Sequence, residues 1–383
     1  MLAPKWLKHA LFFLLVLLSF VAEARVLVGA KYTENGSGQK YVVEKILGTG
    51  SFGTVVVAKR LTDGAQVVLK IFENKKAFES LKVDRQLISE LMQDQLAVGK
   101  VVRSGNLVEA NEELFKTPVI IQEMERMAGV NLEQVAASFR LTDINETPAV
   151  IAIKLRALKK LASDLLEIQK VLIKHRLVHN DIKPANILLR PFSGEFTVER
   201  YVNGEISLAL GDFDTMRRQG EKSGSGTIKY MGLERFTNPG GESRTGSDIF
   251  SLGMTLYELA TGKSYLQELT GREKIYMSDL IKLRSEQLRK FFANEMTYIG
   301  SFEQKASGTN SPADPLTLST LLPKLLEPDI TEREKLAAKE TPLSELAPIL
   351  KEGRMESELL DLVFSACDAL ELGRLAPTQV IQP

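Results

Sequence analysis

The spacing of hydrophobic and polar residues changes along the chain and divides it into two parts. Up to residue 124, short runs rich in valine and isoleucine alternate with polar breaks, which predicts β-strands at 41–47, 54–59, 66–72, 101–108 and 118–124. Residues 62–64, Thr-Asp-Gly, provide a hairpin turn. Apolar positions at helical spacing predict one helix over 76–96. We therefore expect a small antiparallel sheet with one long helix against it.

After residue 131 the pattern becomes helical. It predicts a long amphipathic helix over 148–174, with a proline in its first turn, and an apolar helix over 247–261 that Gly262 ends. Further helices are predicted over 265–293, 316–326 and 356–371, and an exposed loop over 300–312. The predicted fold class is therefore α+β with two lobes, and a cleft between lobes is where ligands usually bind.

The first 24 residues have the pattern of an export signal. Lys5 and Lys8 precede an apolar run over 10–20, and residues 21–24, Val-Ala-Glu-Ala, provide small residues for cleavage. The run is shorter than the roughly 20 residues that cross a bilayer. We expect a signal peptide at 1–24 and an exported protein, whether secreted, periplasmic or lumenal. An uncleaved signal anchor is the alternative, and it would be the only attachment of the protein to a membrane.

Composition narrows the classes of function. The 383 residues are 44% hydrophobic and 26% charged, as in ordinary globular proteins. The formal net charge is zero, so bulk charge does not point to a nucleic-acid partner. The single cysteine, Cys367, excludes an intramolecular disulfide and any cysteine-ligated metal cluster.

A glycine-rich segment joins the first two predicted strands, with the sequence Gly48-Thr49-Gly50-Ser51-Phe52-Gly53-Thr54-Val55. Glycine lets backbone N–H groups approach phosphate oxygens closely, and the valine offers an apolar surface to a nucleobase. A dinucleotide site would need a strand followed by a helix, so the setting between two strands argues against one. Taken alone, the segment also fits a glycine-rich hairpin with no ligand.

Lys70 ends the apolar run of the third predicted strand. A lysine that points inward from a half-buried strand needs a carboxylate partner. In the following helix we expect this partner to be Glu90, because Glu79 lies close to the helix start and Asp84 lies off the apolar face. A solvated lysine at the strand end is the other interpretation.

The segment 177–189, with the sequence LVHNDIKPANILL, carries most of the candidate chemistry. Asp181 can accept a proton from a hydroxyl, and Lys183 can neutralise a phosphoryl group during transfer. Asn186 can bind a metal through its amide oxygen, and Asp212 adds a carboxylate after the next apolar run. Two such ligands together with triphosphate oxygens suit Mg²⁺.

The order and spacing of these pieces resemble the eukaryotic-like serine/threonine protein kinase family. The resemblance implies a kinase domain over 41–383, with an N-lobe at 41–124, a hinge at 125–130 and a C-lobe at 131–383. It implies ATP and Mg²⁺ as cofactors and a protein as the substrate. The residues expected to hold the nucleotide are then Gly48, Gly50, Ser51, Gly53, Val55, Lys70 and Glu90, with the backbone groups of Glu125 and Met127 beside the adenine.

The same resemblance assigns roles further along the chain. Asp181 and Lys183 match the catalytic loop, and Asn186 and Asp212 match the metal-binding positions. Glu234 then looks like the glutamate that ends the activation segment. By the same resemblance Met124 controls access to the back of the pocket, His179 is structural, Asp248 and Gly253 belong to a buried helix, and the partner of the glutamate is Arg374.

The chain departs from the family pattern at three places. Asn180 replaces the arginine that normally holds a phosphorylated activation segment, Asp214 replaces a glycine, and residues 232–233 replace an Ala-Pro pair. Without this arginine, Ser223, Ser225 and Thr227 are weak candidates for sites at which phosphorylation would activate the protein. The sequence therefore predicts activity without phosphorylation of this segment.

The predicted function is transfer of the γ-phosphoryl group of ATP to serine and threonine hydroxyls of proteins, with Asp181 as the catalytic base. Two alternatives stay open at this point. One is a kinase-fold binding module without catalysis, which the departures favour. The other is a kinase for a non-protein hydroxyl substrate, which the same ATP machinery would serve.

Overall fold

The computed structural model describes residues 26–50, 53–72, 85–94, 99–114, 118–223, 226–237, 241–272, 282–307 and 317–337. They form two compact units, the first with residues up to 89 and 103–126, the second with 90–102 and those from 127 on. The predicted features outside the described residues are the signal at 1–24, the helix at 356–371, Ser51, Glu79, Asp84, Ser225, Cys367 and Arg374.

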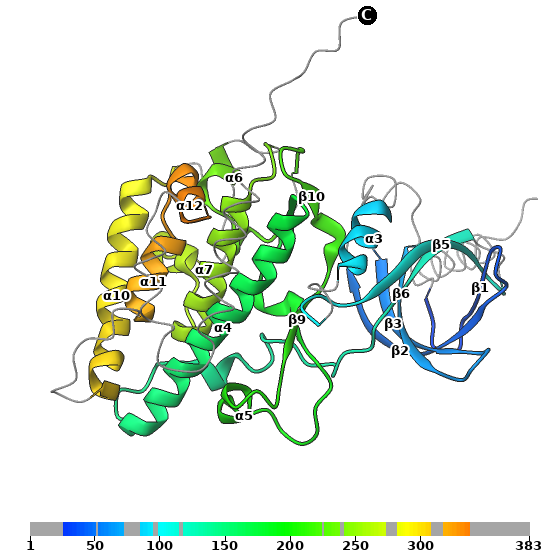
Figure 1. Cartoon of the computed structure of the whole chain (residues 1–383), viewed down its shortest axis with the longest axis horizontal. Helices are drawn as coiled ribbons and strands as arrows, with labels where there is room; N and C mark the ends of the chain where they lie inside the picture. The colour runs from blue at the N-terminus through cyan, green and yellow to red at the C-terminus, as the bar shows by residue number, and fades with distance from the viewer. Residues whose placement is uncertain are drawn as a thin grey trace, which may run out of the picture. The chain divides into compact units, whose positions relative to one another are not determined.

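The first unit is a closed antiparallel barrel (Figure 1) with the strand order β1-β2-β3-β4-β6-β5. Its strands are β1 (Lys31–Glu34), β2 (Lys40–Gly50), β3 (Gly53–Arg60), β4 (Gln66–Phe72), β5 (Ser104–Glu112) and β6 (Pro118–Met124). Five of them correspond to the predicted strands. No strand is predicted at β1, because its four residues are mostly polar. Strand β1 pairs with β2 and with β5, where Tyr32 lies opposite Glu112, and so closes the barrel.

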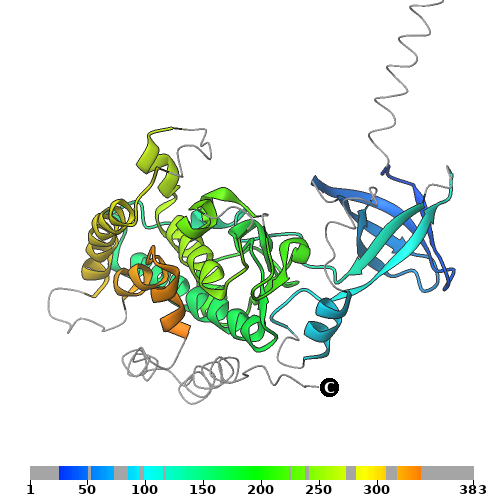
Figure 2. The same ribbon diagram turned by 90° about the horizontal axis from the view of Figure 1, so that it is seen from above.

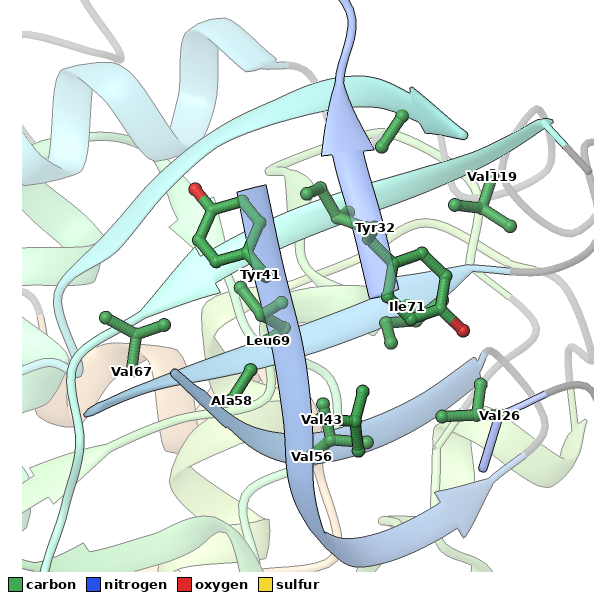
Figure 3. Packing of buried hydrophobic residues seen from close by; sticks show 12 residues of the cluster. Val26, Tyr32, Tyr41, Val43, Val56, Ala58, Val67, Leu69, Ile71 and Val119 are labelled. Carbon is green, nitrogen blue, oxygen red and sulfur yellow. The ribbon is translucent and has the colours of Figure 1, made fainter. Parts of the chain in front are cut away.

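Alternate residues of the strands fill the barrel, as the period of two in a strand requires. Figure 3 shows Tyr32 and Tyr41 among smaller aliphatic side chains from the neighbouring strands. The buried pattern of β2 stops after Val43, and residues 44–50 are exposed. The end of the β2–β3 hairpin, which carries the glycine-rich segment, therefore projects beyond the packed core.

The second unit is mainly helical (Figures 1 and 2). Its longer helices are α4 (Pro148–Lys174), α7 (Thr245–Thr261), α10 (Ser285–Ser307), α11 (Leu318–Leu325) and α12 (Ile330–Ala337). Its shorter helices are α5 (Val198–Val202), α6 (Leu233–Thr237) and α8 (Tyr265–Thr270). Helix α7 packs against α4, α11 and α12, and all of its residues except Glu258 are buried. Helix α3 (Arg85–Gln93) spans the boundary between the two units.

Local signals explain the start of α4. The Thr147 hydroxyl accepts a hydrogen bond from the Val150 N–H at 3.4 Å, and Pro148 occupies the first helical position. The observed bounds equal the predicted range 148–174. Among the described residues, none of the helices combines the length and the apolar character that a membrane span needs.

Two predictions in the second unit are wrong. The helix predicted over 265–293 is interrupted, because α8 ends at Gly271, which adopts a left-handed conformation with φ 63°. The loop predicted from residue 300 is helical up to residue 307. Buried apolar residues continue at helical spacing past Gly300, and their burial outweighs the cost of about 1 kcal/mol for a glycine inside a helix.

Two short ladders in the second unit position the loops between the helices. Strand β7 (Leu177–Val178) pairs with β10 (Arg217–Arg218), and β8 (Ile187–Leu189) pairs with β9 (Leu208–Leu210). The residues predicted to carry catalysis lie between or directly after these strands. The 3₁₀ helices η2 (Pro184–Asn186), η3 (Phe213–Thr215) and η4 (Ile228–Tyr230) continue the same loops.

Candidate active site

The glycine-rich segment lies at the tip of the β2–β3 hairpin of the first unit. Gly48 pairs with Val55 and Gly50 pairs with Gly53 across the hairpin. A Cβ atom at Gly48 or Gly50 would have no neighbouring atom within 4 Å, so packing does not require glycine there. A Cβ atom at Gly53 would lie 2.3 Å from the Ile71 carbonyl oxygen of β4. The first two glycines thus leave their backbone open to a ligand, while the third fits the hairpin against β4.

Lys70 and Val55 face the same side of the sheet. They are cross-strand neighbours of β4 and β3, and Gln122 of β6 is the next neighbour across. Because Val56, Leu69 and Ile71 point into the barrel core, this side is the outer face of the barrel. The Lys70 side chain is buried, and its ammonium lies 5.7 Å from the centre of the Phe72 ring.

The boundary between the two units falls between Arg126 and Met127, within the segment predicted as the hinge. The Glu125 N–H donates to the Arg103 carbonyl oxygen at 2.7 Å, and its carboxylate accepts from the Arg103 guanidinium at 3.0 Å. The backbone group of Glu125 that can meet an adenine is therefore its carbonyl oxygen. The Met127 side chain is buried.

In the second unit, Asp181 is held on both of its carboxylate oxygens. Its Oδ1 accepts from the Thr227 N–H at 2.7 Å, and its Oδ2 accepts from Lys183 Nζ at 2.7 Å. Lys183 Nζ also donates to the Thr227 hydroxyl at 2.7 Å. The structure thus brings the two predicted catalytic side chains together. Thr227 of the activation segment contacts both of them.

Asn186 and Asp212 are brought close by the β8–β9 pairing. The Gly211 N–H donates to the Asn186 carbonyl oxygen at 2.9 Å, and Asp212 follows directly. The Asn186 amide nitrogen donates to the backbone oxygen of Asp181 at 2.8 Å and to its Oδ2 at 3.1 Å. These two hydrogen bonds engage the Asn186 amide nitrogen. The amide oxygen is therefore the atom of Asn186 that can bind a metal. Asp212 is exposed and has a left-handed backbone with φ 61°. An amide oxygen and an accessible carboxylate suit a hard divalent cation.

His179 has the structural role that the sequence predicted. Its ring lies within hydrogen-bonding distance of the Gly211 carbonyl oxygen, at 3.1 Å, and packs edge-on against Phe213. The buried Asp248 carboxylate accepts from the backbone N–H groups of His179 at 2.7 Å and Asn180 at 2.9 Å. Burial raises the pKa of Asp248, and the two N–H bonds oppose this shift. Helix α7 is thereby connected to the catalytic loop.

Glu90 lies in the second unit, at the boundary inside α3, whereas Lys70 lies in the first. Both oxygens of Glu90 lie 3.3 Å from Nη2 of Arg218 in β10. The pairing of Lys70 with Glu90 stays a prediction.

Glu234 has an arginine partner among the described residues, and the predicted partner Arg374 lies outside them. The structure gives this role to Arg333 of α12, whose guanidinium lies 2.7 Å from the Glu234 carboxylate. The Arg333 side chain is fully buried and also donates to the Gly246 carbonyl oxygen at 2.7 Å. Burial of the Arg333 guanidinium needs a carboxylate partner at this place. The pairing of Glu234 with Arg374 stays a prediction.

Asp214 occupies a conformation that any residue adopts. It lies inside η3, and positive φ angles among the described non-glycine residues occur only at Arg176, Asn180 and Asp212. The substitution of the usual glycine therefore adds no backbone strain here. In this short segment the left-handed residue is Asp212, the candidate metal ligand, and not Asp214.

Sequence reasoning missed two residues that meet the catalytic loop. Arg235 donates to the Asn180 amide oxygen, and the Asn180 amide nitrogen donates to the Ser243 hydroxyl at 3.0 Å. Neither residue belongs to a motif, and they lie 55 and 63 residues from Asn180 in the sequence. The one signal for Arg235 in the sequence is its position directly after Glu234.

Comparison with known proteins agrees with this geometry. The family model described as "Protein kinase domain" matches residues 41–346. The chain is 26% identical over 237 residues to a probable serine/threonine-protein kinase, fhkE, of Dictyostelium discoideum, which covers 60% of this chain and 30% of that protein. It is 24% identical over 235 residues to the serine/threonine-protein kinase pkn3 of Myxococcus xanthus, which covers 61% of this chain and 39% of that protein.

Mitogen-activated protein kinase kinase kinase 5 of Homo sapiens is 25% identical over 245 residues, which are 62% of this chain and 15% of that protein. The chain thus spans well under half the length of these curated relatives. A crystal structure of a kinase domain aligns with a TM-score of 0.52 at 19% identity, covering 80% of this chain and 93% of that domain. This likeness confirms the predicted fold class, with a sheet-rich N-terminal lobe and a helical C-terminal lobe.

Proposed function

Because this chain belongs to the protein kinase domain family, we propose that it is an ATP-dependent kinase that phosphorylates serine and threonine hydroxyls of proteins. The observation that carries the proposal is the bonding of Asp181, Lys183 and Thr227 within 2.7 Å of one another. A carboxylate base beside an ammonium group is what hydroxyl phosphorylation needs.

In the proposed reaction, the substrate hydroxyl oxygen bonds to the γ-phosphorus of ATP while the bond from that phosphorus to the bridging oxygen breaks. ADP leaves, and the hydroxyl proton passes to the Asp181 carboxylate. Lys183 offsets negative charge on the group in transfer. Because both carboxylate oxygens of Asp181 already have fixed donors, the base is oriented before the substrate arrives.

We propose Mg²⁺ as the divalent cation. The Asn186 amide oxygen and the Asp212 carboxylate would hold it, and two protein oxygens with phosphate oxygens and waters match its preference. When bound, the cation neutralises part of the triphosphate charge. In the first unit, Lys70 and the backbone at Gly48 and Gly50 would contact the phosphates.

The test is transfer of label from γ-labelled ATP with Mg²⁺ to a generic protein substrate. Asp181→Ala and Lys70→Ala are each expected to lower the rate by at least about 100-fold, because they remove the base and a phosphate contact. The matched controls are Asp63→Ala and Lys59→Ala, which change exposed residues of the β3–β4 hairpin. Transfer that is equal in Asp181→Ala and the wild type would overturn the proposal.

Two other outcomes identify the alternatives. Label that appears only on small hydroxyl compounds would indicate a non-protein substrate. Binding of ATP without any transfer would indicate a binding module.

We also propose that residues 1–24 direct export, with an uncleaved membrane anchor as the alternative. The basic start, the apolar run and the small residues at 21–24 support this. Cell fractionation with N-terminal sequencing tests it. A protein that begins near residue 25 outside the cytoplasm is the expected result, whereas an intact N-terminus in the cytoplasm would contradict export.

A further inference from the structure

The residue before the catalytic base is the centre of a buried hydrogen-bond network. Asn180 has a left-handed backbone with φ 66°, which costs free energy unless its surroundings hold it. Its amide nitrogen lies 3.0 Å from the Ser243 hydroxyl, 3.1 Å from the Thr215 carbonyl oxygen and 3.2 Å from the Val178 carbonyl oxygen. These acceptors come from three separate segments, so one side chain joins them.

Arg235 of α6 completes the network. Its guanidinium donates to the Asn180 amide oxygen, and its Nη2 lies 3.5 Å from the Ser223 hydroxyl. The Arg235 side chain is buried, which lowers its pKa, while the carboxylates of Asp248, Glu234 and Asp181 oppose this shift. Burial of a charged guanidinium costs free energy unless the group has hydrogen-bond partners. The contacts of Arg235 with Asn180 and Ser223 provide such partners.

A backbone ladder holds the activation segment to the chain just before α7. The Gly220 N–H donates to the Ser243 carbonyl oxygen at 2.9 Å, and the Ser243 N–H donates to the Glu221 carbonyl oxygen at 2.6 Å. The Ser223 N–H donates to the Gly241 carbonyl oxygen at 3.0 Å. Ser243 therefore takes part twice, with its backbone in the ladder and with its hydroxyl on Asn180.

The far end of the same segment meets the catalytic loop directly. Gly226 packs against the Asn180 carbonyl oxygen so closely that a Cβ atom would lie 2.5 Å from it. The next residue, Thr227, donates its N–H to Asp181. Protein groups thus fix the segment on both sides of residues 224–225, and Asn180 contacts both sides.

We propose that Arg235 and Ser243 are positioning residues that hold Asn180, and through it Asp181 and Thr227, in the arrangement for phosphoryl transfer without any phosphate on the activation segment. The inference rests on the proposed kinase function. Arg235 supplies from α6 a positive charge that the sequence lacks at position 180. The clamp is defined here as Asn180, Ser223, Arg235 and Ser243.

The variants Arg235→Met and Ser243→Ala each remove one bond to Asn180 and leave no larger side chain behind. We expect kcat to fall about 10- to 100-fold in each, because a catalytic group displaced by about 1 Å loses that much rate. We expect the KM for ATP to stay within about twofold, since neither residue is proposed to touch the nucleotide. The matched control is Arg289→Met, which removes an exposed ion pair with Glu327 and should leave kcat unchanged.

Hydrogen–deuterium exchange gives a readout that does not depend on activity. The amides of Ser223 and Thr227 should exchange faster in both clamp variants than in the wild type and the control. Unchanged exchange in both clamp variants would overturn the inference, whether or not the protein transfers phosphate. Faster exchange in the clamp variants than in a wild type that transfers no phosphate would keep the clamp and reject the function.

Treatment with a phosphatase tests whether the arrangement forms without phosphate on the activation segment. The wild-type protein, shown by mass spectrometry to carry no phosphate on residues 215–231, should keep its full kcat. An enzyme that loses activity on this treatment and recovers it after rephosphorylation of Ser223 or Thr227 would overturn the proposal.

Discussion

At the scale of single residues, two glycines of the candidate site are needed for backbone packing. Gly53 lies under β4, and Gly226 lies against the catalytic loop with φ 139°, in a region that other residues rarely adopt. Their roles differ from those of Gly48 and Gly50, whose surroundings are open. Glycines that look alike in the sequence therefore meet different physical needs here, either close contact with other parts of the protein or access of a ligand to the backbone.

We predict that Gly226→Ala lowers kcat by about 100-fold, because the new Cβ atom would push Thr227 and Asn180 apart. The control is Gly204→Ala, where φ is 80° but no atom lies within 4 Å of the added carbon. This control variant should lose about 1–2 kcal/mol of stability, because alanine disfavours a positive φ, but it introduces no steric clash. Steady-state kinetics of both variants measure the difference, and equal kcat values would contradict the role assigned to Gly226.

The residues of the site were predictable to different degrees. Asp181, Lys183 and Asn186 stand within six positions, so their chemistry is visible in a short segment. Arg235 and Ser243 reach the same loop only through tertiary folding, and no periodicity marks them. The pairing of Glu234 with Arg333 was not predictable for the same reason, since several arginines follow Glu234 in the sequence and only the fold places Arg333 of α12 beside it.

At the scale of elements, local sequence signals set the start of one helix, whereas burial of apolar side chains sets the extent of another. Helix α4 was predicted with its bounds because Thr147 and Pro148 are local start signals. The helix predicted over 265–293 ends before Gly300, which the sequence pattern assigns to a loop, whereas α10 continues to Ser307. The buried Ile299 and Phe302 on either side of it keep the helix intact.

We predict that Gly300→Ala stabilises the protein by about 0.5–1 kcal/mol, because alanine loses less backbone entropy in a helix. The added Cβ atom would lie 3.9 Å from the Ser319 hydroxyl, an ordinary contact. Gly271→Ala should do the opposite and destabilise by about 1 kcal/mol, because its φ of 63° suits glycine. Urea unfolding measures both, and a loss of stability in Gly300→Ala would contradict the helical assignment of residue 300.

At the scale of the whole molecule, each unit has a core of its own. The barrel core includes Val26 and Tyr32, which precede the region matched by the kinase family. The strand pattern in the sequence begins at residue 41, so this pattern predicts the start of the domain there. Strand β1 has one buried apolar side chain, and its place is set only by the two strands that it joins.

We predict that Tyr32→Ala destabilises the first unit by about 3–5 kcal/mol, through loss of a buried aromatic side chain and the cavity left behind. Hydrogen exchange should rise in β1, β2 and β5 and stay unchanged in α4 and α7. The exposed Tyr298 of α10 provides the control variant Tyr298→Ala. An equal rise in both units would show that β1 is not specific to the barrel.

The closure of the barrel by β1 has a practical consequence for producing the protein. A shortened chain that starts at residue 41, where the family match begins, would lack β1 and leave β2 and β5 as edge strands with free backbone donors and acceptors. Such edges pair with other chains and promote aggregation. Expression should therefore start at or before Val26, so that the residues which shield these edges are present.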